Sequence, residues 1–381
     1  MKKKKILIFI DWYLPGFKAG GPIRSVANLV SNLNNEYEFL IVTRDTDYAD
    51  EIPYKSIKQN DWNLLPDGTS VYYFSKEQLN TAAIRKLIDE AGADVVYLNG
   101  MYSRYFTLVP LRYLRRKKAV KVIVAARGML SAGSLGVKST KKRIFLFAAK
   151  MSGLFRHVLF HATTTAEEKD IRAVFGNKAN VKVAGNLPRK NTKETPAARD
   201  KQPGELRLVN VARIAPEKNL LQALLILARV KGKISFDFYG PVYDKAYWKE
   251  CSEAIRMLPA NITASYKGSI ESDKVPALLE KAHMLFMPTT GENFGHIILQ
   301  SLAAGCPVII SDLTPWRQLA EKGIGWDCTI DVDSDDFARV IGIACSMGQQ
   351  EYDTMSAAAA KYAKEYSDDP SLLRDNTDLF R

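Results

Sequence analysis

The chain has 381 residues, of which 46% are hydrophobic and 25% are charged. This length and composition predict a globular protein of two ordinary domains with sizeable cores. No stretch approaches about eighteen uncharged apolar residues, so the sequence argues against a helix that spans a membrane.

The net charge of +12 is unevenly distributed along the chain. Residues 1–190 contain 32 Lys and Arg against 16 Asp and Glu, whereas the remainder contains 22 against 26. The segment 95–166 has 14 basic residues and no acidic residue. Such a charge attracts polyanions, a class that includes nucleic acid, anionic lipid and phosphorylated substrates.

The cysteines and the N-terminus both bear on the compartment. The four cysteines follow no metal-binding spacing and predict buried or incidental thiols in a reducing compartment. The four N-terminal lysines and the apolar run 6–10 are similar to a signal peptide, but the run ends at Asp11 without a small-residue cleavage site. We interpret it as a first strand and expect a cytoplasmic protein. The cysteines are Cys251, Cys306, Cys328 and Cys345.

Strand and helix patterns alternate through the first half of the chain, which predicts a parallel, doubly wound α/β sheet. The predicted strands are 5–10, 38–42, 71–74, 93–98, 120–125, 162–165 and 181–184, and the predicted helices are 22–33, 81–91, 108–118 and 165–175.

Two positions of this half are candidates for ligand binding. Gly20 and Gly21 come directly before a predicted helix, whose first amides form an anion site, and Arg24 adds positive charge there. Arg127 lies just past a predicted strand, at the sheet edge where open α/β folds bind ligands. The alternative for Arg127 is a surface side chain in a turn.

The stretch 138–160 has apolar residues at helical spacing with basic residues among them. It is either a basic amphipathic helix that lies on an anionic membrane or a domain helix whose apolar face lies in the core. We favour the domain helix. Both interpretations hold if the cations at the edge of the helix contact lipid head groups while its apolar face stays in the core. We find no nucleic-acid-binding motif and do not expect nucleic acid as a partner. The apolar residues are Ile144, Phe147, Met151, Leu154 or Phe155 and Val158, and the cations assigned to the acceptor or membrane side are Arg24, Lys141, Lys142 and Arg143.

Residues 189–204 are rich in Lys, Pro and Thr without an apolar period and predict a linker. We therefore expect a first domain over 1–188, a second over 205–365 and a C-terminal segment over 366–381. The second domain has predicted strands at 206–211, 234–239, 263–268, 284–287 and 307–310 and predicted helices from 220 and at 274–282, 294–305, 334–346 and 351–365.

Two loops of the second domain carry the strongest motifs. Arg213 and Lys218 lie between a strand and a helix and can converge with the helix N-terminus on a diphosphate, although a solvated basic loop is the alternative. Glu292 lies in the loop after the strand 284–287. If the next helix begins near residue 293, Glu292 and Gln300 can both face one ligand. The alternative for Glu292 is an acid favoured by the helix dipole.

The segment from Glu292 to Gln300 resembles the Glu-x7-Glu signature of glycosyltransferase family 4, and Arg213 and Lys218 fit the same family. These are retaining, nucleotide-sugar-dependent enzymes of the GT-B fold. The resemblance implies two Rossmann-like, doubly wound domains that face each other across a cleft, with the donor mainly on the second domain and the acceptor on the first. It also implies that the C-terminal segment packs back on the first domain.

The resemblance implies roles for individual residues. Arg213 and Lys218 would neutralise the leaving diphosphate, and Glu292 would orient the sugar hydroxyls. Gln300 replaces the family's second Glu, which holds the ribose, so we expect altered nucleotide affinity rather than lost activity. Arg127 stands at the family's contact to the donor sugar, where many relatives have His. The other implied donor-binding residues are Gly20, Gly21, Gly240, Asn293, Phe294 and Gly295.

We expect a retaining glycosyltransferase that moves a hexose-type sugar from a nucleotide-diphosphate sugar to a glycan or lipid-linked acceptor, without a metal or other cofactor, in cell-surface polysaccharide or lipopolysaccharide biosynthesis. The basic segment 95–166 fits an anionic acceptor at the inner face of the cytoplasmic membrane. Asp331 and Asp333 are similar to a metal-binding pair, but we interpret them as helix capping. The alternatives are a nucleotide-sugar epimerase or phosphorylase of this fold, or a non-catalytic relative that binds nucleotide-sugar or polyanion.

Overall fold

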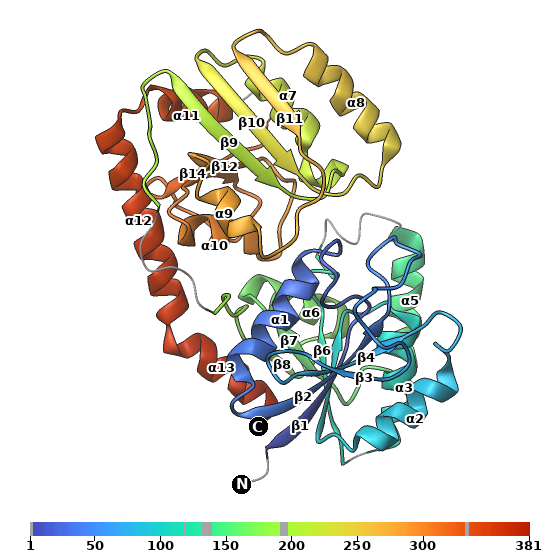
Figure 1. Ribbon diagram of the computed structural model, residues 1–381. Coiled ribbons are helices and arrows are strands. Elements are labelled where there is room, and N and C mark those ends of the chain that lie inside the picture. The colour runs from blue at the N-terminus through green and yellow to red at the C-terminus, as the bar shows by residue number, and fades with distance from the viewer. Residues whose placement is uncertain (1–2, 118, 132–138, 191–196, 332–334) are drawn as a thin grey trace. The chain divides into compact units, whose positions relative to one another are not determined.

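A computed structural model describes residues 3–117, 119–131, 139–190, 197–331 and 335–381. The chain forms two compact units (Figure 1). The first unit comprises Met1–Lys190 and Asp369–Arg381, and the second comprises Asn191–Asp368. Each unit is built around its own sheet, so the two are described separately.

The first unit has an eight-stranded sheet in the order β3-β4-β2-β1-β5-β6-β7-β8. Every neighbouring pair is parallel except β3 and β4. The chain enters at β1 and builds outward on both sides, so the sheet is doubly wound and its strand order reverses between β1 and β5. The strands are β1 (Lys4–Phe9), β2 (Tyr37–Arg44), β3 (Trp62–Leu64), β4 (Ser70–Phe74), β5 (Val95–Asn99), β6 (Lys121–Ala125), β7 (Leu159–Ala162) and β8 (Val181–Val183).

Helices cover both faces of this sheet, because successive side chains of a strand point to opposite faces. In β1, Ile6 and Ile8 pack in the core under α1 and α13, whereas Leu7 and Phe9 pack in the core under the other helices. The helices are α1 (Gly21–Leu33), α2 (Thr81–Ala91), α3 (Val109–Leu114), α5 (Ser139–Met151), α6 (Thr165–Phe175) and α13 (Pro370–Phe380).

The C-terminal helix α13 belongs to the first unit, although it follows the second in the sequence. The Tyr37 hydroxyl donates to the carbonyl of Thr377 at 3.0 Å. Asn376 donates to the carbonyl of Gly185 at 2.8 Å, and the ring of Phe380 lies 5.4 Å from that of Tyr37. The end of the chain is therefore part of the first unit's core.

The second unit has a six-stranded, fully parallel sheet in the order β11-β10-β9-β12-β13-β14. The strand order reverses between β9 and β12, so the loops that follow these two strands emerge side by side at the carboxyl edge. The strands are β9 (Glu205–Val211), β10 (Lys233–Tyr239), β11 (Ile262–Tyr266), β12 (Met284–Met287), β13 (Val308–Ser311) and β14 (Gly325–Cys328).

Two cores lie on opposite faces of the second sheet. Leu206 and Leu208 of β9 pack with α7, α8 and α11, whereas Val209 packs with α9, α10 and α12. The helices are α7 (Leu220–Leu227), α8 (Lys245–Arg256), α9 (Val275–Leu279), α10 (His296–Ala303), α11 (Asp336–Ser346) and α12 (Gln349–Asp368). Within the ranges that the structure describes, none of the helices combines the length and the apolar character that crossing a bilayer requires.

Candidate functional site

The first part of the candidate site is the loop between β9 and α7. It carries Arg213 and a turn of 3-10 helix, Pro216–Lys218, and Asn219 then takes a left-handed conformation with φ 59° before α7 begins. The amide of Ile214 donates to the carbonyl of Pro241 at 3.0 Å, which joins this loop to the one after β10. The basic side chains therefore project from a loop that is fixed at several backbone positions.

Gly240 maintains this junction through its lack of a side chain. A Cβ atom at Gly240 would lie 1.8 Å from the carbonyl oxygen of Ala212, and the residue has φ 150°. The sequence implied a donor-binding role for Gly240. What the structure shows is a close approach of two backbones beside Arg213, which only glycine permits.

The second part of the site is the loop between β12 and α10, which contains Glu292. Gly295 has φ 77° and immediately precedes α10, which begins at His296. The sequence predicted the start of this helix near residue 294, and the left-handed Gly295 explains the later start because it turns the chain before the first helical residue. Glu292 and Asn293 consequently lie in the loop, whereas Gln300 lies within α10.

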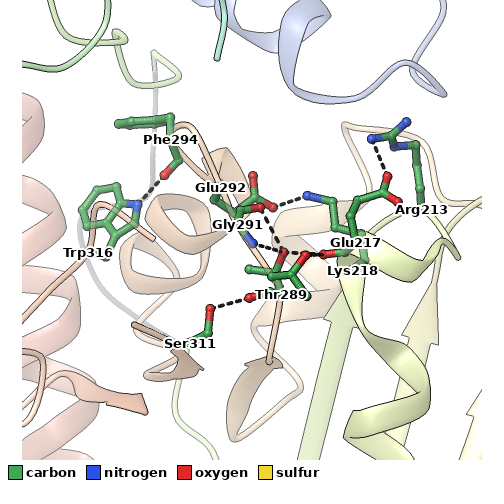
Figure 2. A network of polar contacts seen from close by, with 10 residues as sticks. Arg213, Glu217, Lys218, Thr289, Gly291, Glu292, Phe294, Ser311 and Trp316 are labelled. Atoms are coloured by element: carbon green, nitrogen blue, oxygen red, sulfur yellow. Dashed lines mark hydrogen bonds and ion pairs between the residues drawn. The ribbon is translucent and has the colours of Figure 1, made fainter. Parts of the chain in front are cut away.

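A hydrogen-bonded connection holds these two loops together (Figure 2). The buried hydroxyl of Thr289 donates to the carbonyl of Glu217 at 2.9 Å, and the amide of Thr290 donates to the same carbonyl at 3.0 Å. Ser311, at the end of β13, donates to the carbonyl of Thr289. Thr289 and Ser311 were not predicted from the sequence, because their small hydroxyls form no pattern of their own.

The connection brings Lys218 and Glu292 into an ion pair (Figure 2). Their side chains are only 15% and 16% exposed. Arg213 pairs with Glu217 at 3.1 Å, and these side chains are 39% and 49% exposed. The structure therefore brings together all three residues expected to act in catalysis, at the carboxyl edge of the second sheet. Two cations lie there, each paired with a carboxylate, and only the pair of Lys218 with Glu292 is largely removed from solvent.

Phe294 belongs to the same loop as Glu292. Its side chain is 7% exposed and packs against the rings of Trp316 and Tyr366, at 5.4 Å and 6.1 Å. The indole nitrogen of Trp316 donates to the carbonyl of Phe294 (Figure 2). The expectation that Phe294 binds the donor therefore concerns its backbone alone, because its ring is part of the core.

Arg127 lies in the first unit and is enclosed by polar partners. Its guanidinium donates from Nε to Asn99 at 2.8 Å, from Nη1 to Asn186 at 2.9 Å and from Nη2 to the Tyr97 hydroxyl at 2.7 Å. Its backbone has φ 53°, a conformation in which residues other than glycine are uncommon. Arg127 thus lies in a turn, as the alternative from the sequence had it, but its guanidinium joins β5 to the segment after β8 instead of extending freely into solvent.

The polar network continues beneath Arg127. The Tyr97 hydroxyl lies 2.7 Å from Nδ1 of His161, whose Nε2 lies 2.8 Å from the carbonyl of Ala184. Because a carbonyl only accepts, we assign the proton to Nε2 and the Tyr97 hydroxyl as donor to Nδ1. Burial, followed by the positive charge of Arg127, lowers the pKa of His161 to about 3. Burial raises the pKa of Tyr97 to about 12.

Glu167 is a further residue that was not predicted from the sequence. It is 2% exposed, and its carboxylate accepts from the amide of Gly128 at 2.6 Å and from the amide and hydroxyl of Thr163 at 2.7 Å. Thr165 and Glu168, one residue later, have the spacing of a capping box in the sequence. The residue that caps α6 is Thr164, and Glu167 bonds to the loop after β6. Because the sequence pattern points to residues one position later, it did not predict the hydrogen bond between Glu167 and Gly128.

The remaining predicted residues of the first unit fall in two places. Gly20 has φ 73° and precedes α1, and Arg24 lies one turn into that helix. Burial, followed by the charge of Arg189, lowers the pKa of Arg24 to about 10, so the residue is cationic at neutral pH. Lys141, Lys142 and Arg143 lie at the start of α5. The ammonium of Lys142 lies 5.9 Å from the centre of the Tyr102 ring.

No metal site is evident in the part of the chain that the structure describes, where no group of three or more His, Cys, Asp and Glu side chains could hold an ion. The acid pair noted in the sequence is Asp331 and Asp333, and Asp333 lies outside the described residues. The four cysteines are free and buried, as expected.

Comparison with known proteins identifies the relatives of this architecture. Residues 191–364 match the family model described as glycosyl transferases group 1. A comparison with curated proteins finds no match. Among solved structures, the chain is similar to HepE from Anabaena in complex with UDP and glucose, with TM-score 0.73, 17% identity and coverage of 99% of this chain and 98% of that chain.

Two further structures extend the comparison. Sucrose-phosphate synthase from Thermosynechococcus elongatus gives TM-score 0.71 at 14% identity and covers 100% of this chain and 98% of that one. WaaG, a glycosyltransferase involved in lipopolysaccharide biosynthesis, gives TM-score 0.68 at 14% identity and covers 98% of each chain. These similarities span the full chain and show that it has the GT-B fold.

Proposed function

We propose that the chain, whose residues 191–364 match the model of the group 1 glycosyltransferases, is an enzyme of that family and transfers a hexose-type sugar from a nucleotide-diphosphate sugar to a glycan or lipid-linked acceptor. The observation that carries the proposal is the arrangement of Arg213, Lys218 and Glu292 at one sheet edge. Two cations and one carboxylate match the two parts of such a donor, a diphosphate and a sugar with hydroxyl groups.

The proposed chemistry depends mainly on charge. Cleavage of the anomeric C–O bond leaves negative charge on the diphosphate, and preorganised cations lower the barrier by stabilising that charge. In the proposed bound state, the diphosphate replaces Glu217 as the partner of Arg213 and replaces Glu292 as the partner of Lys218. The freed Glu292 carboxylate then accepts hydrogen bonds from the sugar hydroxyls, and Gln300 contacts the ribose.

In the proposed reaction, the two cations supply the positive charge at the diphosphate that a bound metal ion would otherwise supply. Arg213 and Lys218 neutralise the diphosphate without a bound ion, so the proposed reaction needs no cofactor. We propose a UDP-sugar as the first donor to test, because the HepE structures contain UDP and UDP-glucose. Retention of the anomeric configuration is part of the proposal and rests on the family resemblance alone.

The acceptor side of the proposal rests on the first unit. Its excess of cations favours an anionic acceptor, such as a lipid-linked diphospho-sugar or a lipopolysaccharide core. WaaG, which has the same fold, is involved in lipopolysaccharide biosynthesis. The proposed place of action is the cytoplasm, at the inner face of the cytoplasmic membrane.

A donor-binding screen tests the proposal. UDP-, GDP-, ADP- and CMP-sugars are added to the wild type and to Lys218→Ala and Glu292→Ala, and the shift in melting temperature is measured. The matched control is Lys233→Ala, because Lys233 forms an exposed pair with Glu205 at 2.8 Å in the same unit. We expect one donor to stabilise the wild type and the control but neither site variant.

An assay of sugar release and transfer with the donor that binds decides between transfer and binding alone. If a donor stabilises the wild type but no sugar is released or transferred, the chain is a nucleotide-sugar-binding relative, and Gln300 becomes the first residue to restore to Glu. If no donor stabilises the wild type, or if both site variants respond as the wild type does, the proposed donor site is wrong.

A further inference from the structure

Helix α5 exposes apolar side chains to solvent. Ile144, Phe147 and Met151 are 64%, 68% and 72% exposed. The sequence favoured a place in the core for these residues, and this expectation was wrong. The core side of α5 is formed instead by Leu146 and Ala149, which are 6% and 4% exposed.

The three exposed residues form one continuous stripe. At about 100° per residue, Ile144, Phe147 and Met151 lie within about 60° of one another around the helix axis. Exposed apolar residues scattered singly are normal on a protein surface, whereas several on one helical face indicate an interaction site. We call these three residues the apolar stripe.

Cations flank the apolar stripe on both sides. By the same helical angle, Arg143 and Lys150 lie along one border and Lys141 along the other, and Lys141, Arg143 and Lys150 are exposed. Beyond the end of α5, Gly153 lies between Arg115 and Arg156, with the Arg115 guanidinium 3.7 Å from where a Cβ of Gly153 would be. The segment 95–166, which includes α5, contributes no carboxylate.

We propose that the apolar stripe and its flanking cations form a docking surface for an anionic lipid bilayer. The stripe inserts at the boundary between head groups and acyl chains, while Lys141, Arg143 and Lys150 extend to the lipid phosphates. A protein partner would need a groove rimmed with acids to match this face. A bilayer of anionic lipid supplies both parts, an apolar layer below and negative charge above. Figure 1 shows α5 at the surface of the first unit.

This proposal is independent of the sugar donor, since all its residues lie in the first unit. It adds to the proposed function a reason for a lipid-linked acceptor, because docking concentrates the enzyme at the surface that displays such an acceptor. A failure of vesicle binding would leave the donor-binding screen unaffected, so the two proposals fail separately.

Vesicle flotation tests the docking surface. The full-length protein is mixed with vesicles of phosphatidylglycerol and phosphatidylethanolamine, or of phosphatidylcholine alone, at low and high salt. The first variant is Ile144→Ser/Phe147→Ser/Met151→Ser and the second is Lys141→Gln/Arg143→Gln/Lys150→Gln. The control is Met257→Ser, whose side chain is 82% exposed in the second unit. Melting temperatures verify that each variant is folded.

We expect the wild type and Met257→Ser to float with anionic vesicles at low salt and to bind less at high salt. Each triple variant should lower the partition coefficient by about tenfold or more. A Met151→Cys variant labelled with an environment-sensitive dye should shift its emission to the blue when anionic vesicles are added. The native cysteines are buried, so the label reports position 151.

Three results would overturn the proposal. The first is a wild type that does not bind anionic vesicles, and the second is an apolar-stripe variant that binds as well as the wild type. The third is that the wild type is a dimer and the apolar-stripe variant is a monomer, while neither protein binds vesicles. This result would assign the apolar stripe to a contact between two copies of the chain.

Discussion

Lys218 and Glu292 form an ion pair although 74 residues separate them in the sequence. Their loops follow the adjacent parallel strands β9 and β12, so both emerge at the same edge of the second sheet. The hydroxyl of Thr289 and the amide of Thr290 then fix the two loops through the carbonyl of Glu217. The site is therefore assembled by sheet topology and secured by a few backbone hydrogen bonds.

Thr289→Val tests whether this connection positions the site. Valine keeps the volume of Thr289 but removes the hydroxyl, at a cost of about 1–2 kcal/mol in the free energy of unfolding. In addition to this loss of stability, we expect the KM or Kd of the donor to rise by about tenfold. Ser356→Ala is the control, because Ser356 also donates a buried hydrogen bond to a carbonyl, that of Gly305 at 2.6 Å. Equal effects of the two variants on donor affinity would contradict the role of Thr289.

Glu217→Gln tests the competition between carboxylate and donor for Arg213. The Arg213–Glu217 pair is well exposed, so its free energy is about 1 kcal/mol or less. Removing the carboxylate charge frees Arg213 and should lower the Kd of the nucleoside diphosphate by up to about fivefold. Calorimetric titration measures the change, with Glu271→Gln as control because Glu271 pairs with Lys274 at 2.8 Å. Weaker binding by Glu217→Gln would show that Glu217 assists the donor.

Gly240→Ala tests the junction beside Arg213. The added Cβ would clash with the carbonyl of Ala212, so we expect a loss of about 2 kcal/mol or more in the free energy of unfolding. Gly291→Ala is the matched control, because no atom lies within 4 Å of the position of its Cβ. It should change stability by no more than about 1 kcal/mol. Urea unfolding of both variants measures the difference, and similar midpoints would contradict the role assigned to Gly240.

Stability should depend on pH through the buried histidines. Burial lowers the folded-state pKa of His161 to about 3 and that of His283 to about 4, below their ordinary value of 6.5. Between the folded-state and the ordinary pKa values, the unfolded chain therefore binds more protons than the folded chain. The free energy of unfolding is consequently retained above about pH 6.5 and decreases as the pH falls toward 3. The His161 contribution disappears in His161→Gln, which keeps an acceptor and a donor at the two ring positions.

Urea unfolding at several pH values between 7.5 and 4.5 measures this dependence. We expect His161→Gln to lose less stability than the wild type over this range, whereas the exposed His157→Gln should follow the wild type. An unchanged pH dependence in His161→Gln would show that folding does not lower the pKa of His161.

The sequence predicted most of the fold because the second sheet and most of the first consist of buried strands that alternate with helices. It missed two short strands, β14 (Gly325–Cys328) and the antiparallel β3 (Trp62–Leu64), and it missed α8 (Lys245–Arg256), which is rich in charged and aromatic residues. For α5, periodicity identified the helix but assigned Ile144, Phe147 and Met151 to the core. A helix with apolar residues on two faces does not reveal which one the domain covers.

The site was predicted in part for a similar reason. Arg213, Lys218 and Glu292 follow strands in a recognisable order, so topology alone indicates that they meet. The partners of Arg127 could not be foreseen, because Tyr97, Asn99 and Asn186 come from two separate segments whose register decides the contacts. Pairwise polar contacts of this kind depend on side-chain geometry that a linear pattern does not contain.

Turnover of the donor tests the central claim most directly. The release of nucleoside diphosphate from the donor that binds is measured for the wild type, Lys218→Met, Glu292→Gln and the control Lys233→Met. We predict measurable release by the wild type and the control, and a decrease of about 100-fold or more in Lys218→Met, because a cation that stabilises the developing charge is lost. Glu292→Gln should show a decrease of similar size. Equal release by all four proteins would show that Lys218 and Glu292 do not form the donor site.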